Sequence, residues 1–251
     1  MSKHPRSLFV FLVTFTMILV CTRFESATAE PTVSIRPYVL AGDIRGDVTT
    51  NGVDSDFSQG FGNGFEKGNG AVGLDVDVHG ESVGSLSQLW FTTLGDTGTT
   101  ANLPNVDAAE QALTTTFFTQ AIGISVYREG RNFVDLTLGG RLSSVENTLT
   151  VRTEGKEIEI QDDRIWIDPT VGLNSAVYAS ESVLFRMGGD IGGFGVGSEL
   201  TWQSWASIGV KISKRAGINA GYRIIYHEYE DGDFRYDVSM KGPTLGLDFG
   251  F

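Results

Sequence analysis

The chain is poor in cysteine, in proline and in long apolar runs. Among its 251 residues are 1 Cys and 6 Pro, and the mean hydropathy is −0.03. No segment after residue 30 approaches the ~20 apolar residues that a transmembrane helix needs. Basic residues are also few, because 19 Lys and Arg stand against 31 Asp and Glu, a net charge of −12. This balance, with no basic stripe, argues against nucleic-acid binding.

Glycine and aromatic residues are abundant instead. The chain has 32 Gly, and 11% of its residues are aromatic. Together with frequent Thr and Ser, this composition favours an all-β protein. The apolar share of 41% is too high for a disordered chain.

The start of the chain has the three parts of a secretory signal peptide. Lys3 and Arg6 form a basic beginning, residues 8–20 form an apolar run, and residues 27–29 read Ala-Thr-Ala, a small-x-small cleavage pattern. The apolar run is too short to cross ~30 Å of hydrocarbon as a helix. An uncleaved N-terminal anchor is the alternative.

We therefore predict a signal peptide over residues 1–29 and a mature domain over residues 30–251, beginning at Glu30. Cleavage would remove Cys21, the only cysteine. A mature chain without thiols suits passage through an oxidising compartment.

Through the mature domain, apolar residues recur at every second position, which is the period of a β-strand with two different faces. In the last stretch Leu245, Leu247, Phe249 and Phe251 alternate with small or polar residues. Ten such stretches are present, an even number, as closed bacterial barrels require. They lie at about 32–44, 69–80, 84–95, 112–127, 132–145, 163–178, 182–194, 200–213, 216–229 and 236–251.

The connections between these stretches also differ in length. Those near 81–83, 128–131, 179–181 and 214–215 are short, as are two others, whereas long acidic loops are predicted at about 45–68, 96–111 and 146–162. Short turns and long loops are typical of an outer-membrane barrel. We predict a single closed antiparallel transmembrane β-barrel of ten strands, with eight strands and a plug or hairpin cap as the alternative.

The two sets of alternate positions differ in a way that favours a membrane barrel over a soluble sandwich. The polar set is rich in Gly, Thr, Ser and Asn, which suit a narrow interior. The apolar set is nearly free of charge in the later stretches, as lipid contact requires, because a charge at the bilayer midplane costs ~2–4 kcal/mol. Phe249 and Phe251, with apolar residues at every second position before them, resemble the C-terminal signal for barrel insertion.

The later half of the chain carries a series of motifs. Asp168-Pro169-x-Val171-Gly172-Leu173 is followed by the Gly-rich run 188–198, by Gly221-Tyr222-Arg223 and by Gly242-Pro243-x-Leu245-Gly246-Leu247. In order and spacing this series resembles a small, poorly characterised proteobacterial outer-membrane β-barrel protein family. The resemblance covers about 163–251 well and 30–145 only in general pattern. It implies a membrane barrel and brings no catalytic residues.

Charged residues collect at the positions predicted to face the barrel interior. Their signs are nearly balanced, which predicts ion pairs across a plugged lumen; a polar pathway with charge rings that select solutes is the alternative. Deleting one member of a buried pair can cost ~3–5 kcal/mol, so Arg223→Ala should weaken the barrel more than it changes transport. The predicted network is Arg36, Asp75, Asp77, Asp135, Arg141, Asp168, Arg186, Asp190, Lys211, Arg223 and Asp248.

Evidence for an enzyme or a metal site is weak. The mature chain has two histidines, His79 and His227; the second is expected near the outer rim, but no protease or lipase motif surrounds it. The acidic run 54–60 begins like a calcium loop, yet its Gly falls one position late and the closing Glu is missing. We predict solvated loops there and at 231–233, a flexible Gly-rich loop at 60–64, and no catalytic residues, no metal and no cofactor.

Aromatic residues near the predicted strand ends are expected to form the two interfacial girdles of a membrane barrel. Trp166 and Trp205 are exceptions, because they fall on inward-facing positions and could fill the lumen. The girdle candidates are Trp90, Trp202, Tyr178, Tyr222, Tyr226, Tyr229 and Tyr236.

These observations predict a protein of the cell outer membrane that is structural or a narrow passive pore. A selective channel for small solutes is the main alternative, and a rim-sited hydrolase a less favoured one. The expected partners are outer-membrane lipid and lipopolysaccharide, together with the barrel-assembly machinery during insertion.

Overall fold

The computed structural model describes residues 32–60, 70–98, 100–101, 108–153 and 156–250. The predicted signal peptide, the expected start at Glu30 and the terminal Phe251 lie outside these residues. Among the described residues there is no helix long and apolar enough to cross a membrane.

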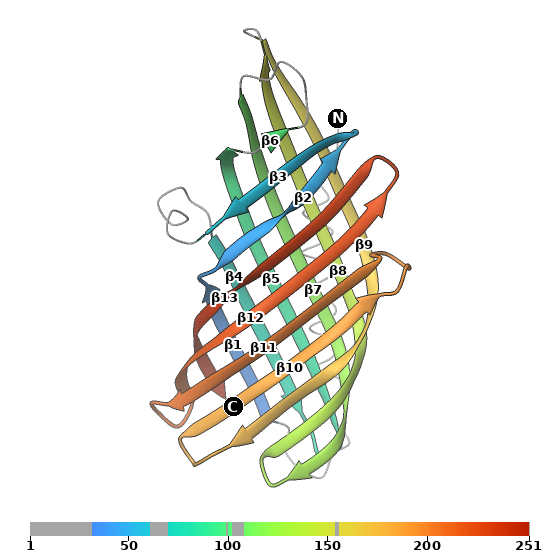
Figure 1. The fold of residues 1–251 in the computed structure, drawn as a ribbon. Coiled ribbons are helices and arrows are strands. Elements are labelled where there is room, and N and C mark those ends of the chain that lie inside the picture. Colours follow the sequence, from blue (N-terminus) through green and yellow to red (C-terminus); the bar gives the residue numbers. More distant parts are fainter. Residues whose placement is uncertain (1–31, 61–69, 99, 102–107, 154–155, 251) are drawn as a thin grey trace, which may run out of the picture.

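The described chain is a single antiparallel sheet that closes on itself through pairing of β1 with β13 (Figure 1). Ten strands form the closed barrel, as predicted, in the order β1-β4-β5-β7-β8-β9-β10-β11-β12-β13, and the eight-strand alternative is wrong. Their bounds are β1 (Thr32–Leu40), β4 (Gly70–His79), β5 (Val83–Gly98), β7 (Ala108–Glu129), β8 (Asn132–Thr153), β9 (Lys156–Tyr178), β10 (Val183–Gly193), β11 (Leu200–Lys211), β12 (Ala216–Asp231) and β13 (Phe234–Gly250).

Three further strands extend the wall at one end of the barrel. They are β2 (Asp43–Thr50), β3 (Val53–Gln59) and the short β6 (Thr100–Ala101). β2 continues the path of β1 along the same neighbour, because β13 pairs with β1 over its last residues and with β2 over its first. The predicted loop at 45–68 is therefore wrong over most of its length, since β2 and β3 form a hairpin there.

The change from β1 to β2 occurs where two glycines meet. The amide of Ala41 donates a hydrogen bond to the carbonyl of Pro243 at 2.9 Å, and beyond it Gly42 lies against Gly242. A side chain on either glycine would collide with the backbone of the other strand. The missing side chains let β1 and β2 follow one another along β13 with a short break.

Strands β7, β8 and β9 are longer than the alternation predicted, and they rise well beyond the others in Figure 1. β8 and β9 stay in register up to the pair Thr153 and Lys156, so the predicted loop at 146–162 is wrong. The predicted loop at 96–111 is likewise shorter, because β5 continues to Gly98 and β7 begins at Ala108.

The strands were predicted too short because apolar residues change face partway along a strand. In the lower part of β8, Leu136 and Leu138 point outward and are 49% and 71% exposed. Further along the same strand, Val145 and Leu149 point inward and are fully buried. Lower apolar side chains therefore face lipid, and upper ones form an interior core. A prediction that follows one unbroken alternation therefore ends the strand at the point where the apolar residues change face.

The change of face divides the barrel into two halves. The lower half has the exposed apolar belt and the short turns at 80–82, 130–131, 179–182 and 212–215. Because bacterial barrels have short periplasmic turns, we refer to this end as the periplasmic end and to the opposite part as the outer half. The outer half has polar side chains outside and apolar ones inside, the usual arrangement of a protein surrounded by water.

Candidate functional site in the barrel lumen

The lumen contains three zones, which differ in chemistry. A cavity opens at the periplasmic end, a layer of charged and amide side chains crosses the middle, and a cluster of apolar and aromatic side chains fills the outer half. We call these the mouth cavity, the polar layer and the apolar layer.

The polar layer is held by ion pairs between strands. Arg223 Nη2 lies 2.7 Å from Asp75 Oδ2. On the same side of the barrel, Arg36 pairs with Asp77 and also lies 3.8 Å from Asp75. All four of these residues are almost fully buried. Each pair joins strands that are not sequence neighbours. Two further pairs, each at 2.5 Å, link Arg141 to Asp190 and Arg186 to Asp248.

Amide side chains connect the two sides of this layer. Gln203 Nε2 donates to Gln88 Oε1 at 2.7 Å and to Asp190 Oδ2 at 2.6 Å, while Gln88 Nε2 donates to Asp75 Oδ1 at 3.4 Å. Asp190 in turn accepts from Arg141. The contacts thus run without interruption from the Arg223 side of the barrel to the Arg141 side. The members of this layer thus satisfy one another's polar groups across the lumen.

Three residues of the predicted network, Asp135, Asp168 and Lys211, lie outside these pairs. Asp168 is fully buried but accepts hydrogen bonds from the Ser198 amide at 2.6 Å and from the Trp166 indole at 3.0 Å. Lys211 is exposed at the periplasmic end and, within the described part of the chain, makes no ion pair. Asp168 therefore anchors the Gly-rich segment before β11 rather than a cation.

Asp135 has a partner that the prediction missed. His79 Nε2 lies 2.6 Å from Asp135 Oδ2, and both groups are buried. The His79 ring also stacks on Phe133, with centroids 3.9 Å apart. The sequence did indicate that His79 faces the lumen, because it continues the inward-facing series that begins at Asp75 and Asp77.

The apolar layer is built around stacked rings. Trp166 stacks on Tyr229 with centroids 4.0 Å apart, and Phe117 stacks on His227 at 3.9 Å and nearly parallel. All four are at most 8% exposed. The layer is completed by Tyr38, Leu40, Ile44, Val48, Phe57, Ala71, Trp90, Leu94, Leu113, Val145, Ile225, Phe234, Tyr236, Val238 and Met240.

The apolar layer corrects several predictions about aromatic residues. His227 is not a rim histidine, because it is 1% exposed inside the barrel. Trp90, Tyr229 and Tyr236 are buried in the lumen and do not belong to a girdle. Trp202 and Tyr226 do lie on the outer face, 6.2 Å apart, where a girdle is expected. Trp166 faces inward as predicted, and so does Trp205, whose ring lies against Arg223.

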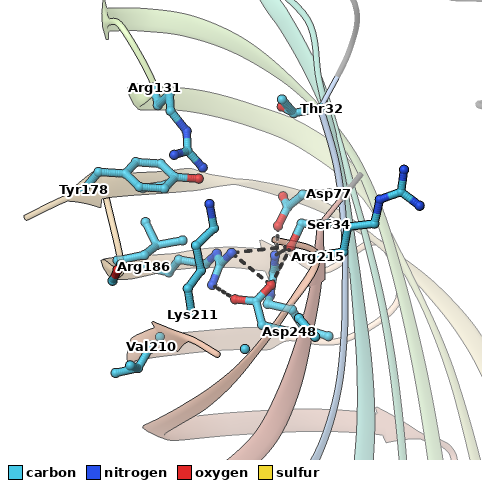
Figure 2. Close-up of a pocket in the computed structure, with 18 of the residues that line it drawn as sticks. Thr32, Ser34, Asp77, Arg131, Tyr178, Arg186, Val210, Lys211, Arg215 and Asp248 are labelled. Carbon is cyan, nitrogen blue, oxygen red and sulfur yellow. Dashed lines mark hydrogen bonds and ion pairs between the residues drawn. The ribbon is translucent and has the colours of Figure 1, made fainter. Parts of the chain in front are cut away.

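The mouth cavity has a volume of about 240 Å³ and lies among the periplasmic turns. Its inner wall includes Arg186, which is paired with Asp248 and also contacts Ser34 (Figure 2). In the same view, Lys211 and Arg131 extend towards one another. The guanidinium of Arg131 lies 3.8 Å from the centre of the Tyr178 ring.

A row of acidic side chains lies on the outer surface of the outer half. Asp47, Asp56 and Asp237 occupy adjacent positions on β2, β3 and β13. The hydrogen bond and the charge of Asp56, together with partial burial, raise the pKa of Asp47 to about 6. Asp54 and Asp56 belong to strand β3, so the solvated loop predicted there is wrong, whereas Gly232 does lie in a turn, with φ of 61°. Most of the predicted Gly-rich loop lies outside the described residues.

Comparison with known proteins adds the fold class. No family model and no curated protein matches the sequence. The crystal structure of the outer-membrane protease OmpT from Escherichia coli matches with a TM-score of 0.57 and 11% identity, over 92% of this chain and 100% of that one. The chain has the fold of the outer-membrane β-barrels. At this identity the likeness shows the fold alone.

Two further solved structures match with lower TM-scores. Ail of Yersinia pestis matches with a TM-score of 0.36 and 12% identity, over 89% of this chain and all of that one. The transport unit of the autotransporter AIDA-I from Escherichia coli matches with a TM-score of 0.43 and 8% identity, over all of both chains.

Proposed function

We propose that this outer-membrane barrel protein does not conduct solutes and that its role is structural, holding a rigid, acidic β-sheet above the membrane surface. The observation that carries the proposal is the apolar layer. Across the outer half, stacked rings and aliphatic side chains pack around the buried, mutually hydrogen-bonded Gln111, Asn147 and Thr50, and this packed interior opposes the passage of water and ions. The polar layer below adds a second obstruction.

The proposal also covers the family of the protein, its export and its surroundings in the membrane. The chain belongs with the small proteobacterial outer-membrane barrels whose motifs it resembles, and a signal peptide over residues 1–29 exports it. Outer-membrane lipid and lipopolysaccharide surround its apolar belt. The assembly machinery recognises a C-terminal signal that includes Phe249 and Phe251.

Planar-bilayer recording tests the central claim. The protein should be purified, its folding checked by the shift in gel mobility between unheated and boiled samples, and then inserted into a bilayer beside a known porin as a positive control. We expect insertion without stepwise current. A steady, ungated current from the folded protein would overturn the proposal and favour the selective channel.

The proposal also excludes a hydrolase at the rim. His227 lies inside the apolar layer, where Thr201 and the Phe117 ring are its neighbours. A general base there would have neither water nor a substrate within reach. Hydrolytic turnover by the folded protein that disappears in His227→Ala, but persists in a His79→Ala control, would contradict this view.

A further inference from the structure

The mouth cavity has a charge opposite to that of the protein as a whole. The chain carries a net charge of −12, yet six residues lining this cavity are Lys or Arg and three are Asp or Glu. A local excess of positive charge in a concave site concentrates anions.

Ion pairing inside the cavity sharpens this imbalance. Arg36 and Arg186 are neutralised by Asp77 and Asp248. The four remaining cations are Arg131, Lys211, Lys214 and Arg215, and Glu181 is the acid left to oppose them. Within the described residues none of these four cations forms an ion pair.

The cations come from two sides of the opening. Arg131 belongs to the turn between β7 and β8, and its guanidinium lies over the Tyr178 ring. Lys211 ends β11 on an inward-facing position, and Lys214 lies in the turn that follows. In Figure 2, Arg131 and Lys211 extend towards a common space, whereas the guanidinium of Arg215 points away from them.

Behind these cations the wall of the cavity is apolar. Ala176 and Leu184 are 4% and 8% exposed, and Phe133 lies beside them. Because Ala176 and Leu184 are almost fully buried, only a small part of this wall is open to the cavity, and an inorganic ion would leave that part in contact with water. An anion that carries a short aliphatic group would cover it, and each buried CH₂ contributes ~0.8 kcal/mol.

We propose that the mouth cavity binds a phosphate ester with a short aliphatic group. The phosphate, with a charge of about −1.5 to −2 in a monoester and a single negative charge in a phospholipid diester, lies between Arg131 and Lys211, and the aliphatic group lies against Ala176 and Leu184. The ester reaches the cavity either as a soluble periplasmic molecule or as the headgroup of a phospholipid in the adjacent leaflet. The site is separate from the obstruction of the lumen above it.

Phosphorus NMR on the full-length mature protein in phosphatidylcholine nanodiscs tests this proposal. Butyl phosphate should bind saturably with a Kd on the order of 1 mM, inorganic phosphate about fivefold more weakly because it lacks the apolar group, and butanol not detectably. No saturable binding of butyl phosphate, or equal binding of inorganic phosphate, would overturn it.

Two variants locate the binding. Lys211→Gln should weaken butyl phosphate binding roughly three- to tenfold, about the effect of losing one charge contact. Lys156→Gln removes an exposed charge at the opposite end of the barrel and should have no effect. Equal weakening by both variants would show only diffuse attraction and would refute the site. Ala176→Leu, checked for folding by gel mobility, should abolish binding by filling the cavity.

The two sources of the ester are separated by repeating the titration in phosphatidylglycerol nanodiscs. If a lipid headgroup occupies the cavity, the apparent affinity for butyl phosphate falls in phosphatidylglycerol and recovers as that lipid is diluted. If the natural ligand is soluble, affinity for the probe is the same in both lipids at matched ionic strength. Either result supports a phosphate-ester site.

Discussion

At the scale of single residues, the polar layer shows what it costs to place charges inside a narrow barrel. Arg223 and Asp75 are 3% and 4% exposed, so both have lost most of their hydration. Their mutual attraction offsets that loss only because further contacts complete the site. Asp75 also lies near Arg36, and the Tyr38 hydroxyl and Gln88 amide donate to it.

Removing the cation should therefore be costly. We expect Arg223→Ala to lower the free energy of unfolding by ~3 kcal/mol, the lower end of the range for a broken buried pair, because Arg36 remains 3.8 Å from Asp75. Urea unfolding in detergent, followed by tryptophan fluorescence, measures the change.

The matched control is Arg152→Ala. Arg152 pairs with Glu110 at 2.8 Å and with Glu157 at 3.0 Å, but its side chain is 45% exposed. Exposed pairs contribute at most ~1 kcal/mol. If Arg223→Ala left the unfolding midpoint where Arg152→Ala leaves it, the polar layer would not stabilise the barrel.

The sequence alone placed most of these charges on one face, because alternation decides on which side of a strand each residue lies. It could not assign partners. Asp135 pairs with a histidine and Asp168 with backbone and hydroxyl groups, choices that depend on the stagger between distant strands. Lys211 shares the alternation but lies at the end of its strand, where water reaches it.

At the scale of elements, the strands of the lipid belt were the predictable ones. The stretches expected at 182–194, 200–213 and 216–229 correspond to β10, β11 and β12 within two residues at most boundaries. Lipid on one side and a polar lumen on the other impose an alternation of apolar and polar residues that is visible in the sequence. The hairpin of β2 and β3 was missed because its apolar residues, such as Val48 and Phe57, are few and face inward between acidic neighbours.

That hairpin should respond to pH. Asp47 has a pKa of about 6 in the folded hairpin against an ordinary value of 3.8, because it shares a hydrogen bond with Asp56. The folded state thus holds the proton more tightly than the unfolded state, so the stabilisation is complete below about pH 4 and is lost as the pH rises through 6. Solvent screens the pair, so the effect is small, under ~1 kcal/mol.

Hydrogen exchange of the β2–β3 amides, corrected for the intrinsic rate, should be slower at pH 5 than at pH 7.5. Asp47→Asn should remove this difference. Asp54→Asn, on the same hairpin, should preserve it, because Asp54 accepts a hydrogen bond from Thr49 at 2.7 Å instead. Loss of the pH response in both variants, or in neither, would contradict the assignment to Asp47 and Asp56.

At the scale of the whole molecule, the barrel is one sheet stabilised by two different environments. In the lower half, lipid faces the apolar side chains and ion pairs fill the lumen. In the outer half, water surrounds the wall and the apolar layer is the only large hydrophobic core among the described residues. The two halves share strands, yet the forces that hold them are separable.

Trp166→Ala tests that separation. Trp166 is 6% exposed, stacks on Tyr229 and donates to Ser198 Oγ at 2.7 Å, so its loss should cost ~3–5 kcal/mol. The lost ring contacts lie in the apolar layer, and the lost hydrogen bonds are to Asp168 and to Ser198 in the Gly-rich segment. Hydrogen exchange should therefore accelerate in the outer parts of β8 and β9, while amides beside the lipid belt keep their protection. The barrel should still show the gel-mobility shift of a folded protein.

Ile167→Ala is the matched control, since Ile167 follows directly in the chain but is 61% exposed on the outer face of the barrel. It should leave exchange in the outer half unchanged. If Trp166→Ala instead accelerated exchange equally along the whole of β8 and β9, the barrel would unfold as a single cooperative unit. The apolar layer would then support the membrane-embedded half as well, and the outer sheet could not be regarded as a platform carried by an independently stable barrel.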